Sequence, residues 1–487
     1  MAVKHYLSFI EGAYTDVAPM LIPDNGLYTM SNVNTSYKLG SILKRPGYVI
    51  VGSALEANNS ITGLYNFRQN ETTSKVLATV NNANDNAMQL LYSTGSSWTE
   101  LTDAETAWSG YEDANVEMEA FIEYCFFVGY DSTDAVWLPV RTLTGTTFGT
   151  TNTTNMPNAK YIKRYRDRLY LGNCYSGSAA YPYRVYFSSV PSAGTISWTV
   201  ATDFIDVDYS EAITGLGENW DEMLIFTEYS TYMYNQESFK KVFDVGCSNH
   251  RTIKNSGAYT IWANRDGVWA STGGRPNNIA GRIIDFIRAS NMKNSFAEIV
   301  GEEYYLYLGS VTVNGVAYSN CTAVFNIPTQ TWRIHEYYNT MTVFGKYFSS
   351  GKDALWMGTS VGSVMRHGQY SDSTFLPTDN GQPIHSWFQT GALHFDYPHI
   401  KKVLNKIVTY TDRAMGLKLK ARVWDANAQA ITEFRPLGEI KKYIDEFQIN
   451  PNKGHLLQIE GIENGSNAYW SFFGFTVDYT EDAPFKK

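Results

Sequence analysis

The feature of this sequence that most limits its possible folds is a degenerate repeat of short strand-like segments. The segment Ile61–Leu64 (Ile-Thr-Gly-Leu) recurs as Ile213–Leu216, and each copy precedes a polar stretch and then an apolar run of strand length. A small-polar turn that carries tryptophan follows a strand at three places, at Trp98, Trp198 and Trp332. Each unit spans about 35–45 residues, which is enough for a four-stranded antiparallel sheet. Sheets of that size arranged radially form a β-propeller.

We therefore expect an all-β chain with a β-propeller of six or seven blades. The expected blades lie near 60–101, 116–140, 160–200, 212–245, 253–287, 296–335 and 341–368. A string of unrelated hairpins and one large β-sandwich are the alternative architectures. The composition agrees with strands, because aromatic residues make up 15% of the chain and favour pleated, half-buried surfaces.

Local turn signals locate several hairpins. Tyr165–Leu171 is a polar turn that leads into an apolar strand, and Asn314-Gly315 is a type I′ turn signal. Ala263–Trp269 carries an Asp-Gly turn of the same kind. Helical periodicity is scarce, and the best helical candidates are the short segments Gly281–Ala289 and Leu437–Phe447.

The two ends of the chain differ from its middle. We expect an N-terminal extended arm with strand pieces at 1–55, a β-propeller at 56–370, a turn-rich linker at 371–381 and a C-terminal β-sandwich at 382–487. The expected sandwich strands are Ser386–Leu393, Val403–Thr411, Leu417–Trp424, His455–Ile462 and Trp470–Tyr479. Five strands over about a hundred residues suit a sandwich of ordinary size.

Charge and cysteine content indicate which partners and which cellular compartment suit this protein. The chain has 39 Lys and Arg against 48 Asp and Glu, a net charge of −9, which argues against a general nucleic-acid-binding face. An acidic wall that repels DNA is compatible with this charge. Four widely separated cysteines predict free thiols in a reducing compartment. We expect no signal peptide, no membrane span, no metal and no cofactor.

Two groups of polar residues are candidates for reactive sites. His394, Asp396 and His399 are the nearest approach to a metal cluster, and an exposed strand end is the better interpretation. Asp206 and Asp208, with Glu211, would place two carboxylates on one strand face, and a solvated strand edge is the better interpretation. The common hydrolase and nucleotide-binding motifs are absent, so we expect no enzymatic activity.

The densest basic stretch has tyrosines between its charges. Its basic residues are Lys160, Lys163, Arg164, Arg166 and Arg168. Cations interleaved with aromatic rings suit contact with a nucleic acid backbone. A hairpin with outward basic residues that face a neighbouring subunit is the alternative, and we favour it.

The N-terminal pattern, with Gly40 followed by Arg45-Pro46-Gly47, resembles the opening of tail hub or nozzle proteins of short-tailed bacteriophages, including those called packaged-DNA stabilisation proteins. The resemblance continues through Lys160–Leu171 and Ile213–Leu216, and near the C-terminus through Trp470–Tyr479. The order of these motifs along the chain makes the case for the resemblance.

The resemblance implies a virion structural protein that forms a homohexameric ring at the distal end of the tail. Such a ring continues the portal and adaptor channel, closes it in the mature virion and opens for DNA ejection. The implied partners are other copies of the chain, the portal or adaptor protein, tail fibres or spikes, and genomic DNA as non-specific cargo. The implied location is the virion tail, and the bacterial host cytoplasm during assembly. A β-propeller that binds or hydrolyses polysaccharide is the alternative function.

Overall fold

The computed structural model describes residues 2–55, 59–70, 74–82, 86–111, 114–257, 259–349, 352–370, 375–413, 416–425, 430–431, 433–450, 453–465 and 469–482. Nearly all regular structure in these residues is β-strand, paired almost throughout in antiparallel sheets, which confirms the all-β prediction. The helices are short: η1 (Pro19–Leu21), α1 (Asp103–Ala107), η2 (His250–Thr252), η3 (Gly281–Ile283), α2 (Ile284–Ala289) and η4 (Met292–Asn294).

Seven sheets follow one another along residues 61–383 of the described chain. The first three comprise β6 (Ile61–Arg68), β7 (Ser74–Asn82), β8 (Ala87–Ser93) and β9 (Trp98–Glu100); β10 (Ala114–Phe121), β11 (Tyr124–Asp131), β12 (Val136–Trp137), β13 (Arg141–Thr144) and β14 (Thr147–Gly149); and β15 (Asn158–Tyr165), β16 (Arg168–Ser176), β17 (Ala179–Phe187) and β18 (Phe204–Asp206). The next three comprise β19 (Ile213–Asn219), β20 (Glu222–Thr227), β21 (Thr231–Tyr234) and β22 (Phe239–Phe243); β23 (Lys254–Ser256), β24 (Tyr259–Asn264), β25 (Gly267–Ser271) and β26 (Asn277–Asn278); and β27 (Phe296–Val300), β28 (Glu303–Val313), β29 (Val316–Asn326) and β30 (Thr331–Glu336).

The seventh sheet combines strands from distant parts of the chain. It contains β31 (Met341–Ser349), β32 (Lys352–Thr359), β33 (Val364–His367), β5 (Tyr48–Ile50), β34 (Thr378–Asp379) and β35 (Gln382–Pro383). β5 pairs antiparallel with β33, so a strand from the N-terminal segment takes the fourth position in this sheet. Strands β34 and β35 also place part of the expected linker in the sheet; residues 371–374 of that linker lie outside the described residues.

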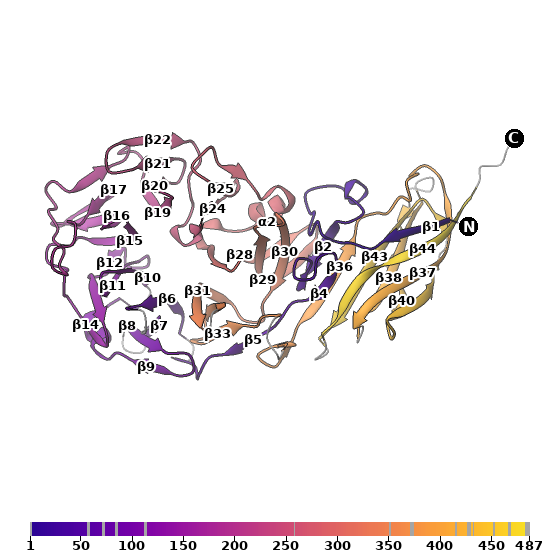
Figure 1. Ribbon diagram of the computed structural model, residues 1–487, viewed down its shortest axis with the longest axis horizontal. Coiled ribbons are helices and arrows are strands. Elements are labelled where there is room, and N and C mark those ends of the chain that lie inside the picture. The colour runs from indigo at the N-terminus through magenta and orange to yellow at the C-terminus, as the bar shows by residue number, and fades with distance from the viewer. Residues whose placement is uncertain are drawn as a thin grey trace.

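The seven sheets lie around a common centre (Figure 1). The first strand of each sheet contacts the first strand of the next, from β6 through β10, β15, β19, β23 and β27 to β31. β31 in turn contacts β6, so the last sheet meets the first. These seven first strands therefore surround the axis of the ring.

Two further sheets form the C-terminal part, seen beside the ring in Figure 1. One contains β3 (Val33–Asn34), β4 (Ile42–Lys44), β44 (Ser471–Glu481), β37 (Lys402–Arg413) and β41 (Ile444–Gln448), with β1 (Ala2–Tyr6) on β44 and β42 (Lys453–Gly454) on β37. The other contains β2 (Leu27–Ser31), β36 (His385–Thr390), β43 (Leu456–Asn464), β38 (Lys418–Asp425) and β39 (Ala430–Ile431), with β40 (Arg435–Glu439) on β38.

Apolar side chains of both C-terminal sheets meet in one core. Ile407 and Phe475 from the first sheet and Leu419 and Ile459 from the second belong to the same buried cluster. That cluster continues without interruption into the ring, where it includes Trp332. The N-terminal strands β1–β4 thus belong to the C-terminal sheets, and the hydrophobic effect holds both parts of the molecule together.

One local expectation is wrong. Leu437–Phe447 is not a helix, because β40 pairs with β38 and β41 pairs with β37, and pairing with neighbouring strands overrides the weak local helical pattern. Gly281–Ala289 is helical, as η3 and α2. The Asn314-Gly315 hairpin between β28 and β29 is confirmed, with positive φ at both turn residues, as a type I′ turn requires.

Candidate functional site

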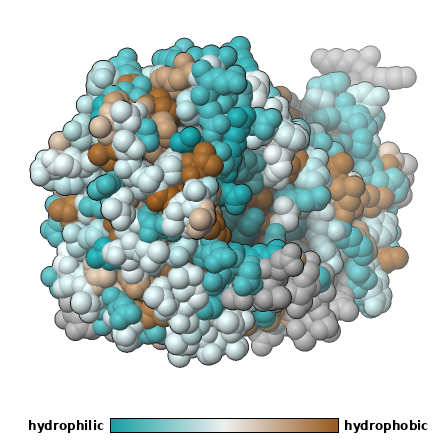
Figure 2. Space-filling model, turned by 60° about the vertical axis from the view of Figure 1, so that its left-hand side comes forward, coloured by the Kyte–Doolittle hydropathy of each residue, from teal (hydrophilic) through white to brown (hydrophobic). Residues whose placement is uncertain are grey.

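A polar channel runs along the axis of the ring. Two cavities, of about 420 and 600 Å³, are lined mainly by residues on or next to the first strands of the sheets. Both are bordered by Glu117, Arg251 and Phe296, so these residues lie where the two cavities meet. In the space-filling view, hydrophilic residues border a hollow, and the hydrophobic side chains on this face are scattered (Figure 2).

Arg251 crosses from one side of this axis to the other. It begins on η2, before the fifth sheet, and its Nη2 donates to the carbonyl oxygens of Thr62 (2.5 Å) and Val116 (3.2 Å). Its Nε donates to Oε1 of Glu117 at 2.7 Å. Burial alone would raise the pKa of Glu117, but Arg251 and His250 outweigh it and hold that pKa below its usual value. The ion pair therefore stays charged and interrupts the channel.

Charges of alternating sign line one end of the channel. Six consecutive sheets contribute, in order, Glu119, Lys163, Glu218, Lys254, Glu298 and Lys346. The ammonium of Lys163 lies 3.7 Å from the Glu218 carboxylate, and that of Lys254 lies 3.2 Å from Glu298. Burial raises the pKa of Glu119, with Lys163 opposing the shift. Because neighbouring charges have opposite signs, the ion pairs link neighbouring sheets. Because the six residues comprise three acidic and three basic side chains, they give this part of the channel no excess of either charge.

The predicted basic stretch does not form one face. Lys160 lines one cavity, with its ammonium 3.4 Å from the ring centre of Tyr130, and Lys163 lines the other. Arg166 donates to the Asp221 carbonyl and Arg168 to the Ser188 carbonyl. Arg164 is exposed. Strand β15 thus sends its two lysines towards opposite ends of the channel, and the arginines of the stretch lie on β15, the following turn and β16, away from both cavities.

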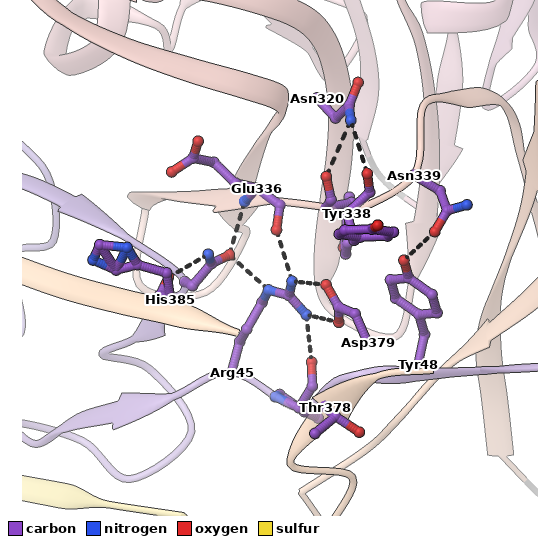
Figure 3. A network of polar contacts seen from close by, with 12 residues as sticks. Arg45, Tyr48, Asn320, Glu336, Tyr338, Asn339, Thr378, Asp379 and His385 are labelled. Atoms are coloured by element: carbon purple, nitrogen blue, oxygen red, sulfur yellow. Dashed lines mark hydrogen bonds and ion pairs between the residues drawn. The ribbon is translucent and has the colours of Figure 1, made fainter. Parts of the chain in front are cut away.

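The motif around Arg45 lies where the N-terminal segment, the ring and the C-terminal sheets meet (Figure 3). The Arg45 guanidinium makes two hydrogen bonds to Asp379, of 2.8 and 2.6 Å, and donates to the carbonyls of Glu336 and Pro46. Its Nε donates to Asn32 Oδ1, and Asn32 donates to the carbonyl of His385. Arg45 is fully buried. One guanidinium therefore joins the N-terminal segment to β30 of the sixth sheet and β34 of the seventh.

The glycines of this motif have steric roles. A Cβ on Gly47 would lie 1.8 Å from the Thr378 carbonyl oxygen, so only glycine fits where the residue before β5 meets the start of β34. The Gly47 backbone donates to the Leu376 carbonyl and accepts from the Gly368 amide. Gly40 has φ +85°, in the left-handed region that favours glycine. Arg45, Pro46 and Gly47 thus shape and fasten one junction, whereas Gly40 lies against Ser8 and accepts a hydrogen bond from the Phe9 amide.

Acidic residues from both groups of candidate reactive residues pair with other side chains of the protein. Asp206 forms a bidentate pair with Arg184, with hydrogen bonds of 2.6 and 2.7 Å. Glu211 accepts hydrogen bonds from Thr227 and Ser230. Asp396 pairs with Lys4 at 2.7 Å. In the part of the chain that the structure describes, no group of three His, Cys, Asp or Glu side chains is placed to hold a metal ion.

The sequence did not predict the alternating charges or the Arg251–Glu117 ion pair that interrupts the channel. The repeat carries a signal for the channel-lining position but not for the charge, because the fifth residue after its isoleucine lines the cavity in both copies, as Asn66 and Glu218. Arg251 lies outside any repeat and has no comparable signal.

A scan against protein-family models finds no match for this chain, and a search of the curated proteins finds none either. Across the residues placed in the structure, we find no helix with the length and apolar character needed to cross a membrane.

Proposed function

We propose that this chain is a virion structural protein, a tail hub or nozzle subunit of a short-tailed bacteriophage, and that its seven sheets are the blades of a β-propeller. In this proposal, six copies form a ring at the distal end of the tail, beneath the portal and adaptor proteins and in contact with tail fibres or spikes. The ring closes the DNA channel in the virion and opens for genome ejection. The chain has no catalytic role in this proposal.

The observation that carries the proposal is the junction at Arg45. Part of the motif through which the sequence resembles the tail hub family, Arg45-Pro46-Gly47, lies at the contact that unites the N-terminal segment, the ring and the C-terminal sheets. A buried network of this kind favours a subunit whose parts keep a fixed orientation. A hexamer that must hold packaged DNA under pressure needs such a subunit.

The surface and the channel add support. Large aromatic side chains are exposed at Tyr209, Trp220 and Tyr443, with 70%, 71% and 70% of their surface accessible, and such residues are enriched at protein interfaces. Because Arg251 and Glu117 interrupt the axial channel within each subunit, DNA would pass through the central opening that the six subunits enclose. A net charge of −9 would let DNA slide without binding tightly.

Electron microscopy of phage particles labelled with an antibody to this chain tests the proposal. We expect label at the distal tip of the tail. Label on the capsid surface, or its absence from particles, would contradict the proposal. A hexamer in solution, or one that forms only on the adaptor, agrees with it; a strict monomer that retains or hydrolyses polysaccharide favours the alternative glycan-directed function.

A further inference from the structure

Apart from the two axial cavities, a cleft lies between the sixth sheet, the seventh sheet and the N-terminal segment. It has a volume of about 580 Å³. Its lining includes Arg333 and His335 from β30, His367 from β33, and Glu303 and Tyr305 from β28. These residues are separate from the axial channel and from the hydrogen bonds of Arg45.

Three almost wholly buried side chains in this cleft carry polar atoms without a partner. Arg333, His335 and His367 expose 3%, 1% and 6% of their surface. Within the described residues, neither ring nitrogen of His335, nor Nε2 of His367, nor Nε of Arg333 has a hydrogen-bond partner. An unsatisfied buried polar group costs about 1–3 kcal/mol, so several in one cleft call for an explanation, such as a bound ligand.

The chemistry of each atom is defined by its neighbours. Nδ1 of His367 lies 2.7 Å from the Gly368 carbonyl oxygen, which can only accept, so Nδ1 carries the proton and Nε2 is an acceptor. Nε of Arg333 is a donor. Burial lowers the pKa of His335 well below its usual value and that of His367 to about 3, so both rings are neutral near pH 7. Neutral His335 offers one donor and one acceptor.

The charges deep in the cleft balance one another. Arg333 Nη2 lies 2.5 Å from Glu303 Oε1, and the other Glu303 oxygen accepts from the Tyr305 hydroxyl at 2.6 Å. Glu302, Lys352 and Asp353 line the remaining wall and contribute both signs. An anion would meet the Glu303 carboxylate and the lone pair of His367, and a cation would meet Arg333. A neutral ligand avoids both penalties.

Hydroxyl groups match this set of atoms, because each hydroxyl both donates and accepts. The cleft is also lined by the aromatic residues Tyr305, Phe348, Tyr37 and Tyr370, of which the last two stack on each other with ring centres 4.3 Å apart. Apolar ring faces with a few convergent polar groups are typical of small-molecule sites. We propose that this cleft binds a neutral saccharide, with ring hydroxyls bonded to His335, His367 and Arg333 and a sugar face against the tyrosines. The inference does not depend on the proposed tail function.

Saturation-transfer NMR of the full chain tests the inference, with D-glucose, D-galactose and N-acetyl-D-glucosamine as separate probes. We expect transfer to at least one of them. His335→Phe, which removes both ring nitrogens, and Phe348→Ala, which removes a half-exposed wall, should each lower the signal at least fivefold. Tyr338→Ala is the matched control, since Tyr338 is an exposed aromatic residue outside the lining, and it should leave the signal unchanged.

Phe348→Ala keeps the test decisive if His335→Phe fails to fold. No transfer to any probe at tens of millimolar, equal signals in wild type and Phe348→Ala, or displacement of the sugar by inorganic phosphate would each overturn the inference. A crystal structure soaked in the best probe gives a second answer. Sugar hydroxyls on His335 and His367 would support the site, whereas ordered waters that persist on these atoms would show a hydrated cleft only and overturn it.

Discussion

Arg45 and Asp379 form a bidentate ion pair although they are 334 residues apart in the chain, and the two side chains expose 0% and 3% of their surface. The pair connects the segment that leads into β5 with β34, the strand next to β5 in the seventh sheet. Arg45 also bonds to β30 and to Asn32, between β2 and β3, so the loss of either charge would destabilise contacts between several sheets.

Asp379→Asn should strongly destabilise the protein. It leaves the Arg45 guanidinium buried without a compensating charge, which costs about 3–5 kcal/mol. The matched control is Asp412→Asn, because Asp412 pairs with Lys38 and both are about half exposed. Exposed pairs contribute less than about 1 kcal/mol. Urea denaturation of the two variants measures the difference, and equal losses would contradict the role assigned to Arg45.

Gly47→Ala should disrupt the same junction by a steric route. The added Cβ would overlap the Thr378 backbone, and overpacking of this kind costs about 1–3 kcal/mol or more. Gly149→Ala is the control, since its Cβ would have no neighbour within 4 Å, and we expect a change within about 0.5 kcal/mol. Thermal melts followed by circular dichroism compare them. A Gly47→Ala protein as stable as the control would show that the backbone there can yield.

Acid should destabilise the fold through its buried histidines. Burial lowers the pKa of His367 to about 3 and that of His250 to about 4, whereas an unfolded histidine titrates near 6.5. Below pH 6.5 the unfolded chain binds protons that the folded chain does not, so stability is complete above that pH and is lost as pH falls towards 4. Each such histidine contributes up to about 1.4 kcal/mol per pH unit.

His367→Gln should reduce this dependence, because the variant has one fewer group that protonates only on unfolding. Urea midpoints measured from pH 7 to pH 4 give the slope for each protein. His399→Gln, at an exposed position, is the control and should keep the wild-type slope. An unchanged slope in His367→Gln would mean that this ring is protonated in the folded protein.

The arginines of the basic stretch should contribute little to DNA affinity. Arg166 and Arg168 bond to carbonyl oxygens of the chain itself, and Lys160 and Lys163 line the axial channel. Arg166→Gln combined with Arg168→Gln should therefore leave double-stranded DNA binding and its salt dependence unchanged in fluorescence anisotropy. A fall of about one in the logarithmic salt slope for each residue would instead identify phosphate contacts.

Much of the local structure could be predicted from the sequence. Alternation of apolar and polar residues identified the strands of the C-terminal part, and Asn314-Gly315 identified a hairpin, because strand period and turn chemistry are properties of neighbouring residues. The same reasoning mistook Leu437–Phe447 for a helix. There the pairing partners, β37 and β38, decide the conformation, and they lie far away in sequence.

The sequence by itself determined the all-β class, the positions of most strands and the segments that hold a repeat. Only the tertiary structure decided that β5 completes the seventh sheet, that β1–β4 join the C-terminal sheets, and that Arg45 meets Asp379. It also decided that the lysines of one basic stretch point to opposite ends of a channel and that two histidines share a cleft. The physical reason is that strand patterns arise from local side-chain alternation, whereas sites arise from burial and charge pairing between residues that only the complete fold brings together.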